Sequence, residues 1–231
     1  MKIKGLLKTS VIEYPGKVAT VVFVGGCNFR CPYCHNRDLV LRPESLADIG
    51  VEKVLRLLAE RQRFVDGVVI TGGEPMLQVD LADFIQELKA LGLAVKLDTN
   101  GCCPQALRRL LQERMLDYVA MDVKGPLEKY SLATGRRIDV NQIEDSIQLL
   151  LSSEIEYEFR TTVVPRIVTV RDVEAIAELI AGARRYFLQQ FRPSCTLDPQ
   201  FAKTAPYPAP VLEEMADAAR RWVTHVSLRG I

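Results

Sequence analysis

Short apolar runs alternate with segments of helical periodicity along most of this chain. Between the runs, apolar residues recur every three or four positions, as at Val51, Val54, Leu55 and Leu58, which predicts amphipathic helices. The runs have the length and β-branched content of buried strands and lie at 18–24, 67–70, 94–97, 118–121, 157–164 and 186–191. Another helix is expected around 212–222, before a short apolar stretch at 223–228. This alternation predicts right-handed βαβ units and a parallel sheet.

The length of the chain limits how many such units it can hold. Six units in 231 residues predict an α/β fold built as a partial, open (βα)6 barrel with parallel strands. A closed eight-unit barrel typically takes about 250 residues, and a flat doubly wound sheet is the alternative geometry. We expect a single domain over 1–231, with a core at about 15–195 and a C-terminal helix and short strand at 210–231.

The residues that follow the predicted strands are unusually polar for simple turns. Because the carboxyl ends of parallel strands meet at one rim, we expect these residues to surround a common site. In chain order they are the loop from Cys27 to Asn36, Thr71-Gly72-Gly73-Glu74-Pro75, Asp98-Thr99-Asn100-Gly101, Asp122-Val123-Lys124-Gly125, Arg160 with Thr162, and Phe191-Arg192-Pro193.

Three cysteines, Cys27, Cys31 and Cys34, are spaced closely enough to bind one metal centre. Iron–sulfur clusters are usually held by four thiolates, so three would leave one iron open to another ligand. A structural zinc site is the alternative, and it would need His35 or a distant cysteine as a fourth ligand. The cysteine spacing alone does not decide between the two.

The glycines and acidic residues at the rim each allow more than one interpretation. The Gly72-Gly73 pair lets backbone approach a ligand closely, or it simply forms a turn. Glu74 offers a carboxylate to an ammonium group. Asp98 can bind a hydroxyl, a cation or a lysine, or it can cap the next helix.

The charged residues of the next two strands are expected to interact with each other or with a ligand. Asp122 and Lys124 share a face of their strand, so they either pair or present a split charge to a zwitterion. Arg160 in an apolar strand needs a partner, either Asp122 or a carboxylate ligand. An amino-acid head group satisfies the whole set. S-adenosylmethionine carries one and is a source of radical chemistry beside iron–sulfur clusters.

Composition narrows the class of protein further. Thirty basic and 29 acidic residues leave a net charge of +1, which gives no global attraction to nucleic acid or to an anionic membrane. The chain has no apolar run long enough for a membrane span, and its first ten residues do not form a signal peptide. Six cysteines without a secretion signal indicate reduced thiols, so we expect a cytoplasmic protein.

Two motifs together resemble the radical S-adenosylmethionine (radical SAM) superfamily. They are Cys27-x3-Cys31-x-Tyr33-Cys34 and Gly72-Gly73-Glu74-Pro75. The segments Cys31–Asn36, Asp98–Gly101 and Asp122–Lys124 resemble the glycyl radical enzyme activases. The opening segments Gly5–Ser10 and Glu13–Gly16 are similar to anaerobic ribonucleoside-triphosphate reductase activating proteins.

The resemblance implies a reaction and its partners. The cysteines would hold a [4Fe-4S] cluster, and reductive cleavage of S-adenosylmethionine would give a 5′-deoxyadenosyl radical. That radical would abstract a glycine hydrogen from a glycyl radical enzyme, an anaerobic ribonucleotide reductase by this branch. A flavodoxin or ferredoxin-type protein would donate the electron.

The resemblance also implies roles for individual residues. Tyr33, Cys34 and His35 would contact the adenine through their backbone, and Gly73 with its neighbours Gly72 and Glu74 would bind the amine. Asp122 and Lys124 would lie near the ribose and the carboxylate, which Arg160 would also face. Members of this type can bind a monovalent cation, and Asp98, Thr99 and Asp122 match its ligand positions.

Some residues depart from the activase pattern or stay unassigned. Arg192 stands where some activases carry a histidine, and Cys195 has no assigned role. Cys102 and Cys103 are either small buried residues or a redox pair. One alternative function is a radical SAM enzyme acting on a small molecule, similar to 7-carboxy-7-deazaguanine synthase, although Tyr33 and His35 differ from that group. The other is a non-enzymatic zinc module.

Overall fold

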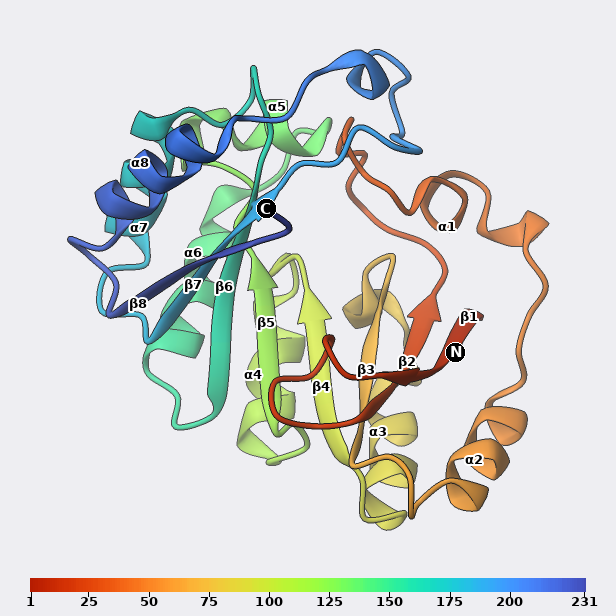
Figure 1. Ribbon diagram of the computed structural model, residues 1–231. Coiled ribbons are helices and arrows are strands. Elements are labelled where there is room, and N and C mark those ends of the chain that lie inside the picture. The colour runs from red at the N-terminus through yellow and green to blue at the C-terminus, as the bar shows by residue number, and fades with distance from the viewer.

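In the computed structural model, which describes residues 1–231, eight strands form one sheet in the order in which they occur along the chain (Figure 1). The first two strands are antiparallel, and every later neighbouring pair is parallel. The first and last strands are not paired with each other, so the barrel is open. The strands are β1 (Ile3–Ser10), β2 (Ala19–Val24), β3 (Gly67–Gly72), β4 (Ala94–Thr99), β5 (Tyr118–Asp122), β6 (Glu156–Val163), β7 (Arg185–Gln190) and β8 (His225–Arg229).

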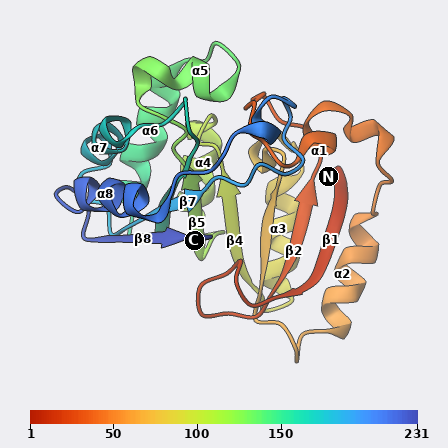
Figure 2. The same cartoon turned by 45° about the horizontal axis from the view of Figure 1, so that its top comes forward.

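Helices cover the convex face of this curved sheet (Figures 1 and 2). A core of 52 buried residues fills the space between the two layers. None of the helices is both long and apolar enough to cross a membrane. The helices are α1 (Arg37–Leu41), α2 (Val51–Glu60), α3 (Leu81–Ala90), α4 (Pro104–Gln112), α5 (Tyr130–Thr134), α6 (Val140–Leu151), α7 (Val170–Leu179) and α8 (Ala209–Ala219).

Local sequence explains where the longer helices begin. Pro104 occupies the first turn of α4, where its missing N–H costs nothing. Thr169 and Asp172 form a capping box at the start of α7, and Asp139 caps α6. The apolar stripes of these helices then pack on the sheet, as the periodicity predicted.

The concave face of the sheet is apolar at one end and polar at the other. Tyr14, from the connection between β1 and β2, packs in a separate small cluster that includes Val21, Val69 and Tyr118. Its ring lies 5.9 Å from the Tyr118 ring. Toward the carboxyl ends of the strands the concave face becomes charged, so the cleft is polar where the strands end.

The prediction of an open, parallel α/β barrel is confirmed, and the structure adds one strand at each edge of the predicted six. Strand β8, expected as a short strand, pairs parallel with β7 and extends the sheet. Strand β1 was not predicted, because its exposed lysines and weak alternation do not resemble a buried strand. It lies at an edge, where only part of its surface needs to be apolar.

Candidate functional site

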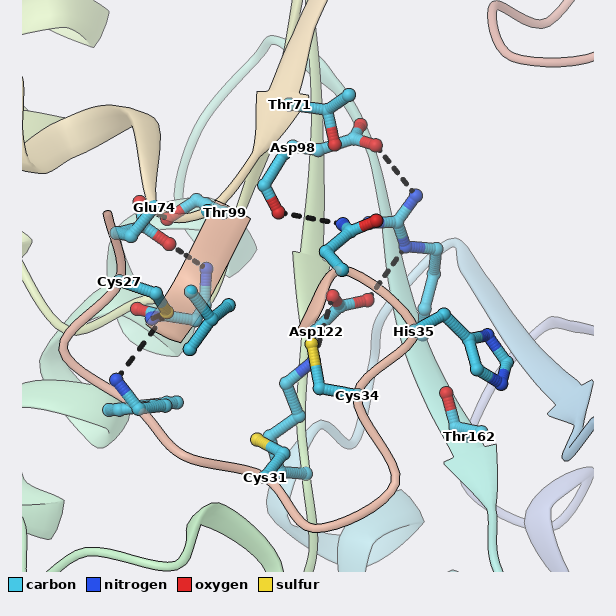
Figure 3. Close-up of a pocket in the computed structure, with 18 of the residues that line it drawn as sticks. Cys27, Cys31, Cys34, His35, Thr71, Glu74, Asp98, Thr99, Asp122 and Thr162 are labelled. Carbon is cyan, nitrogen blue, oxygen red and sulfur yellow. Dashed lines mark hydrogen bonds and ion pairs between the residues drawn. The ribbon is translucent and has the colours of Figure 1, made fainter. Parts of the chain in front are cut away.

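A cavity of about 290 Å³ lies at the carboxyl ends of the strands (Figure 3). All twelve residues that the sequence analysis selected line it, and they come from five strands, β2 to β6, or from the loops that follow them. They are Cys27, Cys31, Tyr33, Cys34, His35, Gly72, Gly73, Glu74, Asp98, Asp122, Lys124 and Arg160. The cavity wall also includes Thr71, Thr99, Asn100, Thr162 and Gln189.

The cysteine loop after β2 is held in place by its neighbours on both sides. On one side, the Glu74 N–H donates to the Gly26 carbonyl at 2.8 Å. The Asn36 side chain donates to the Gly72 carbonyl, also at 2.8 Å. On the other side, the Arg30 N–H donates to the Thr134 carbonyl at 2.8 Å. The loop geometry therefore depends on residues from β3 and α5 as well as on its own sequence.

The three cysteine thiols of the loop are shielded from solvent, which opposes their ionisation. Burial raises the pKa of Cys27 to about 11 and that of Cys31 to about 12, so each thiolate needs a nearby cation, which a bound metal supplies. No three His, Cys, Asp or Glu side chains converge closely enough to hold one metal ion. The Nε2 of His35, the proposed fourth zinc ligand, lies 2.6 Å from the Arg192 carbonyl oxygen.

Glu74 turns away from the role expected of it. Its carboxylate is 1% exposed and accepts hydrogen bonds from the Thr99 hydroxyl at 2.8 Å and from the N–H of Asn100 at 2.7 Å and of Met76 at 3.1 Å. All three donors belong to the chain itself, so the carboxylate ties the turn after β3 to the turn after β4. Gly72 and Gly73 line the cavity beside it.

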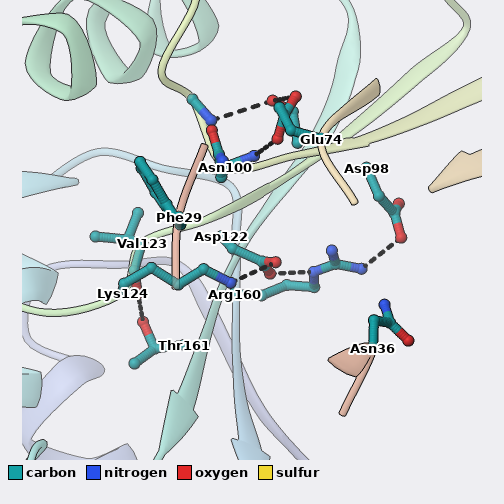
Figure 4. A network of polar contacts seen from close by, with 12 residues as sticks. Phe29, Asn36, Glu74, Asp98, Asn100, Asp122, Val123, Lys124, Arg160 and Thr161 are labelled. Atoms are coloured by element: carbon teal, nitrogen blue, oxygen red, sulfur yellow. Dashed lines mark hydrogen bonds and ion pairs between the residues drawn. The ribbon is translucent and has the colours of Figure 1, made fainter. Parts of the chain in front are cut away.

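Five charged side chains form a continuous network across the ends of β4, β5 and β6. Figure 4 labels Asp98, Asp122, Lys124 and Arg160 of this network. Arg160 donates from Nε to Asp122 at 2.8 Å and from a terminal nitrogen to Asp98 at 3.1 Å. Lys124 pairs with Asp122 at 2.9 Å, and Lys96 pairs with Asp98 at 2.5 Å. Burial alone would raise the pKa of both aspartates, but these cations hold each pKa below its usual value.

The charge balance of this network suits a ligand carboxylate. Three cations, Lys96, Lys124 and Arg160, face two aspartates, which leaves an excess of one positive charge. The Tyr33 hydroxyl, also at the cavity, is buried and has no hydrogen-bond partner. The Gly73 N–H donates to the Val24 carbonyl at 2.8 Å, which leaves the Gly73 carbonyl for a ligand amine. Together with that carbonyl, these groups fit the amine, carboxylate and polar atoms of S-adenosylmethionine.

The residues expected at a monovalent-cation site are engaged with protein groups. Asp98 and Asp122 each bridge two basic side chains, and the Thr99 hydroxyl donates to Glu74. Both carboxylates therefore already have cationic partners in this structure.

Two contributors to the site were missed in the sequence. Lys96 is almost fully buried, and its spacing from Asp98 placed both residues on one face of β4. Gln189 lies beside Thr162 in the register between β6 and β7 and reaches the same cavity wall. A lysine in an otherwise apolar strand was the sequence signal that could have identified Lys96. No sequence signal pointed to Gln189.

Replacing Cys31 with alanine is expected to lower iron binding by more than about 100-fold, since even residues that only support a metal ligand change affinity by about 10–100-fold. Iron analysis after anaerobic reconstitution measures the effect. Cys195→Ala is the matched control, because Cys195 is exposed and lies outside the cavity. Equal iron content in the two variants would contradict the assignment.

Protein stability is expected to fall because of Glu74 as the pH rises from about 4.5 to about 7. Burial, partly offset by its hydrogen bonds, raises the Glu74 pKa from 4.5 to about 7. A carboxyl with a raised folded-state pKa favours the folded state only while it is protonated, so stability is lost as the pH rises toward that pKa. The shift corresponds to a loss on the order of 3 kcal/mol.

Thermal unfolding of wild type and Glu74→Gln at several pH values measures this effect. The melting temperature of the wild type should fall more steeply with pH than that of the variant. Parallel pH profiles would show that Glu74 does not titrate in this range.

Comparison with known proteins agrees with this geometry. The family model of the radical SAM superfamily matches residues 21–180. A candidate glycyl-radical enzyme activating enzyme from Methanocaldococcus jannaschii is 34% identical over 99% of this chain and 96% of its own length. The pyruvate formate-lyase-activating enzyme of Clostridium pasteurianum is 27% identical over 85% of this chain and 83% of its own length.

Solved structures share the fold at low sequence identity. Streptococcus suis SuiB bound to its precursor peptide SuiA superimposes with a TM-score of 0.70 and 12% identity, covering 91% of this chain and 48% of that one. A domain of a Bacteroides vulgatus pyruvate-formate lyase-activating enzyme gives 0.57 at 14% identity, covering 71% and 99%. The family match over residues 21–180, with the cysteine loop at its start, establishes that this chain belongs to the radical SAM superfamily, whose members use a [4Fe-4S] cluster and S-adenosylmethionine.

Proposed function

We propose that this protein activates a glycyl radical enzyme, with an anaerobic ribonucleotide reductase as its substrate. The observation that carries the proposal is a second cavity of about 620 Å³ that adjoins the first. His35, Arg160, Thr162 and Gln189 line both cavities, so the two are continuous.

The second cavity supports a polypeptide substrate rather than an enclosed small molecule. Its wall runs from the β1–β2 connection at Glu13 to the end of β8 at Arg229, across the opening of the barrel. Small-molecule sites usually bury most of the ligand surface. An open and mostly polar channel instead suits an extended backbone, whose N–H and C=O groups need partners along its length.

The chain's own residues would prepare the site for this reaction. When bound, the cluster and S-adenosylmethionine supply the one-electron chemistry by which this superfamily abstracts hydrogen atoms. Cys27, Cys31 and Cys34 would hold the cluster, and Lys124 with Arg160 would orient the carboxylate of the cofactor. Asp122 keeps both cations in place through its two ion pairs.

Relatives support the activase class, while the ribonucleotide reductase branch rests on the N-terminal segment. The relatives from M. jannaschii and C. pasteurianum cover 99% and 85% of the chain. The branch motif Glu13-Tyr14-Pro15-Gly16 lies at the channel, where Glu13 and Pro15 line the wall and Tyr14 fills the floor of the barrel. A flavodoxin or ferredoxin-type protein is the proposed electron donor.

A small-molecule function is the second candidate. The 7-carboxy-7-deazaguanine synthase of Hyperthermus butylicus is 38% identical to this chain, but over 41% of the chain and 40% of its own length. That similarity therefore covers far less of the molecule than the similarity to the activating enzymes does.

Electron paramagnetic resonance tests the proposal directly. Reduced, reconstituted protein is incubated with S-adenosylmethionine and either an anaerobic ribonucleotide reductase or pyruvate formate-lyase. A glycyl radical signal with the reductase supports the full proposal. A signal with the lyase alone would overturn the branch, and cofactor cleavage without a signal from either enzyme would overturn the activase class.

A further inference from the structure

Two adjacent cysteines lie just outside the site, between β4 and α4. The Sγ atoms of Cys102 and Cys103 are 3.4 Å apart. Cys102 is 8% exposed and Cys103 is half-buried, and neither lines the central cavity. The hydrogen bond from Cys102 lowers the pKa of Cys103, which favours its reactive thiolate form.

Asn100 connects this thiol pair to the cysteine loop. Its side-chain oxygen accepts from the Cys102 N–H at 3.0 Å, and its side-chain nitrogen donates to the Asn28 side-chain oxygen at 2.9 Å. The same nitrogen lies 3.9 Å from the Cys27 sulfur. A backbone change at Cys102 would therefore move a residue that supports the first cysteine of the motif.

A separate surface pocket of about 370 Å³ reaches Cys102, one member of the pair, from outside. Cys102 and Asn28 line it together with Arg136 and Arg137. Both arginines are exposed, and neither side chain forms an ion pair or hydrogen bond in the structure. Asp139 also lines the pocket, so the two arginines leave it one net positive charge, which would attract an anionic reagent to Cys102.

We propose that Cys102 and Cys103 form a redox modification site that reacts with anionic low-molecular-weight disulfides. One cysteine thiolate attacks the disulfide and releases the first thiol of the reagent. The neighbouring cysteine then attacks the mixed disulfide and releases the second. Overall, two protein thiols lose two electrons and two protons to form a Cys102–Cys103 disulfide, and the reagent is reduced to two thiols.

Formation of this disulfide would strain the turn that contains Asn100. Neighbouring Cα atoms are about 3.8 Å apart across a trans peptide, which is below the separation of most disulfides. The strain makes the bond readily reducible and requires the backbone at Cys102 to shift. The modification would thus loosen the Asn100–Asn28 contact and be reversed by thiols.

Mass spectrometry of the reconstituted protein tests the site. Trypsin cleavage after Lys96 and Arg108 isolates a peptide whose only cysteines are Cys102 and Cys103. After anaerobic treatment with oxidised glutathione, this peptide should lose two hydrogens and resist alkylation, while the protein releases iron faster than the untreated sample. Dithiothreitol should restore both alkylated thiols.

Variants separate the thiol pair from the other cysteines. Cys103→Ser should abolish the treatment-dependent iron release, whereas Cys195→Ser, at an exposed position elsewhere, should leave it unchanged. Oxidation confined to other cysteines, with the 97–108 peptide still reduced, would overturn the proposal. Iron release that persists at the wild-type rate in Cys103→Ser would overturn the coupling to the cysteine loop.

A second pair of measurements tests the two arginines. The double change Arg136→Glu with Arg137→Glu should slow oxidation by glutathione disulfide about tenfold and accelerate oxidation by cystamine, which is cationic. General damage to the fold would change both rates in the same direction. If the rates with glutathione disulfide and with cystamine changed in the same direction, the proposed role of the arginines would be overturned. Arg56→Glu with Arg63→Glu is the matched control, because both residues are exposed and lie at or after α2, far from α5 in Figure 1.

Discussion

Replacing Arg160 with methionine is expected to destabilise the protein by about 3 kcal/mol, because each of two buried aspartates loses one of its two cationic partners. Arg160 bridges Asp98 and Asp122, whose side chains are 8% and 25% exposed. Lys96 and Lys124 remain as partners, which keeps the effect at the lower end of the usual range. In a chain of this size the loss corresponds to a melting temperature about 6–12 °C lower.

Arg160→Lys is the matched control for this change. It keeps the charge but cannot donate to both aspartates with the geometry of a guanidinium, so an intermediate loss is expected. A double variant, Arg160→Met with Asp98→Asn, should cost less than the sum of the two single changes because the two residues interact directly. Additive losses would contradict the network.

Replacing Gly73 with alanine is expected to disrupt the site more severely than any other single methyl addition at the rim. A Cβ at this position would lie 1.9 Å from the Gly26 carbonyl oxygen, a backbone atom of the cysteine loop. The turn after β3 would have to move away, which breaks the 2.8 Å hydrogen bond from the Glu74 N–H to Gly26. We expect a loss of about 3 kcal/mol together with strongly reduced iron binding.

Gly125→Ala provides the comparison. Its added Cβ would meet nothing closer than the Ala133 side chain at 3.6 Å, which is an ordinary contact. Melting temperature and iron content should therefore remain close to wild type in Gly125→Ala and fall together in Gly73→Ala. Wild-type iron content in a folded Gly73→Ala protein would show that the two loops are not locked together.

The periodicity of apolar residues predicted the strands and helices that are buried in the same way in each βα unit. The parallel strands β2 to β7 are buried on the helix side, and their apolar runs reported this directly. Strand β1 has no such signature, since it lies at an edge and most of its residues are partly exposed. Its place in the sheet follows from its antiparallel pairing with β2, and the local sequence pattern does not predict which strands pair.

The location of the site could be predicted because the carboxyl ends of parallel strands meet at one rim. The partners of each side chain were harder to predict. Glu74 was expected to face an amine, yet its carboxylate accepts three donors from the chain. The partnership of Asp98 with Arg160 depends on how β4 and β6 are placed across β5, which spacing alone does not specify.

The strands are paired in the order of the chain, so the partner that each new strand needs has already been synthesised when that strand leaves the ribosome. The hairpin of β1 and β2 is synthesised first. The cysteine loop is fixed by backbone hydrogen bonds when Gly73 and Glu74 follow. Asp98 and Asp122 appear later without their shared counter-ion. Arg160 is the last of these groups to be synthesised. A nascent chain can therefore shape the metal-binding loop well before the two aspartates are bridged and the site gains its excess positive charge.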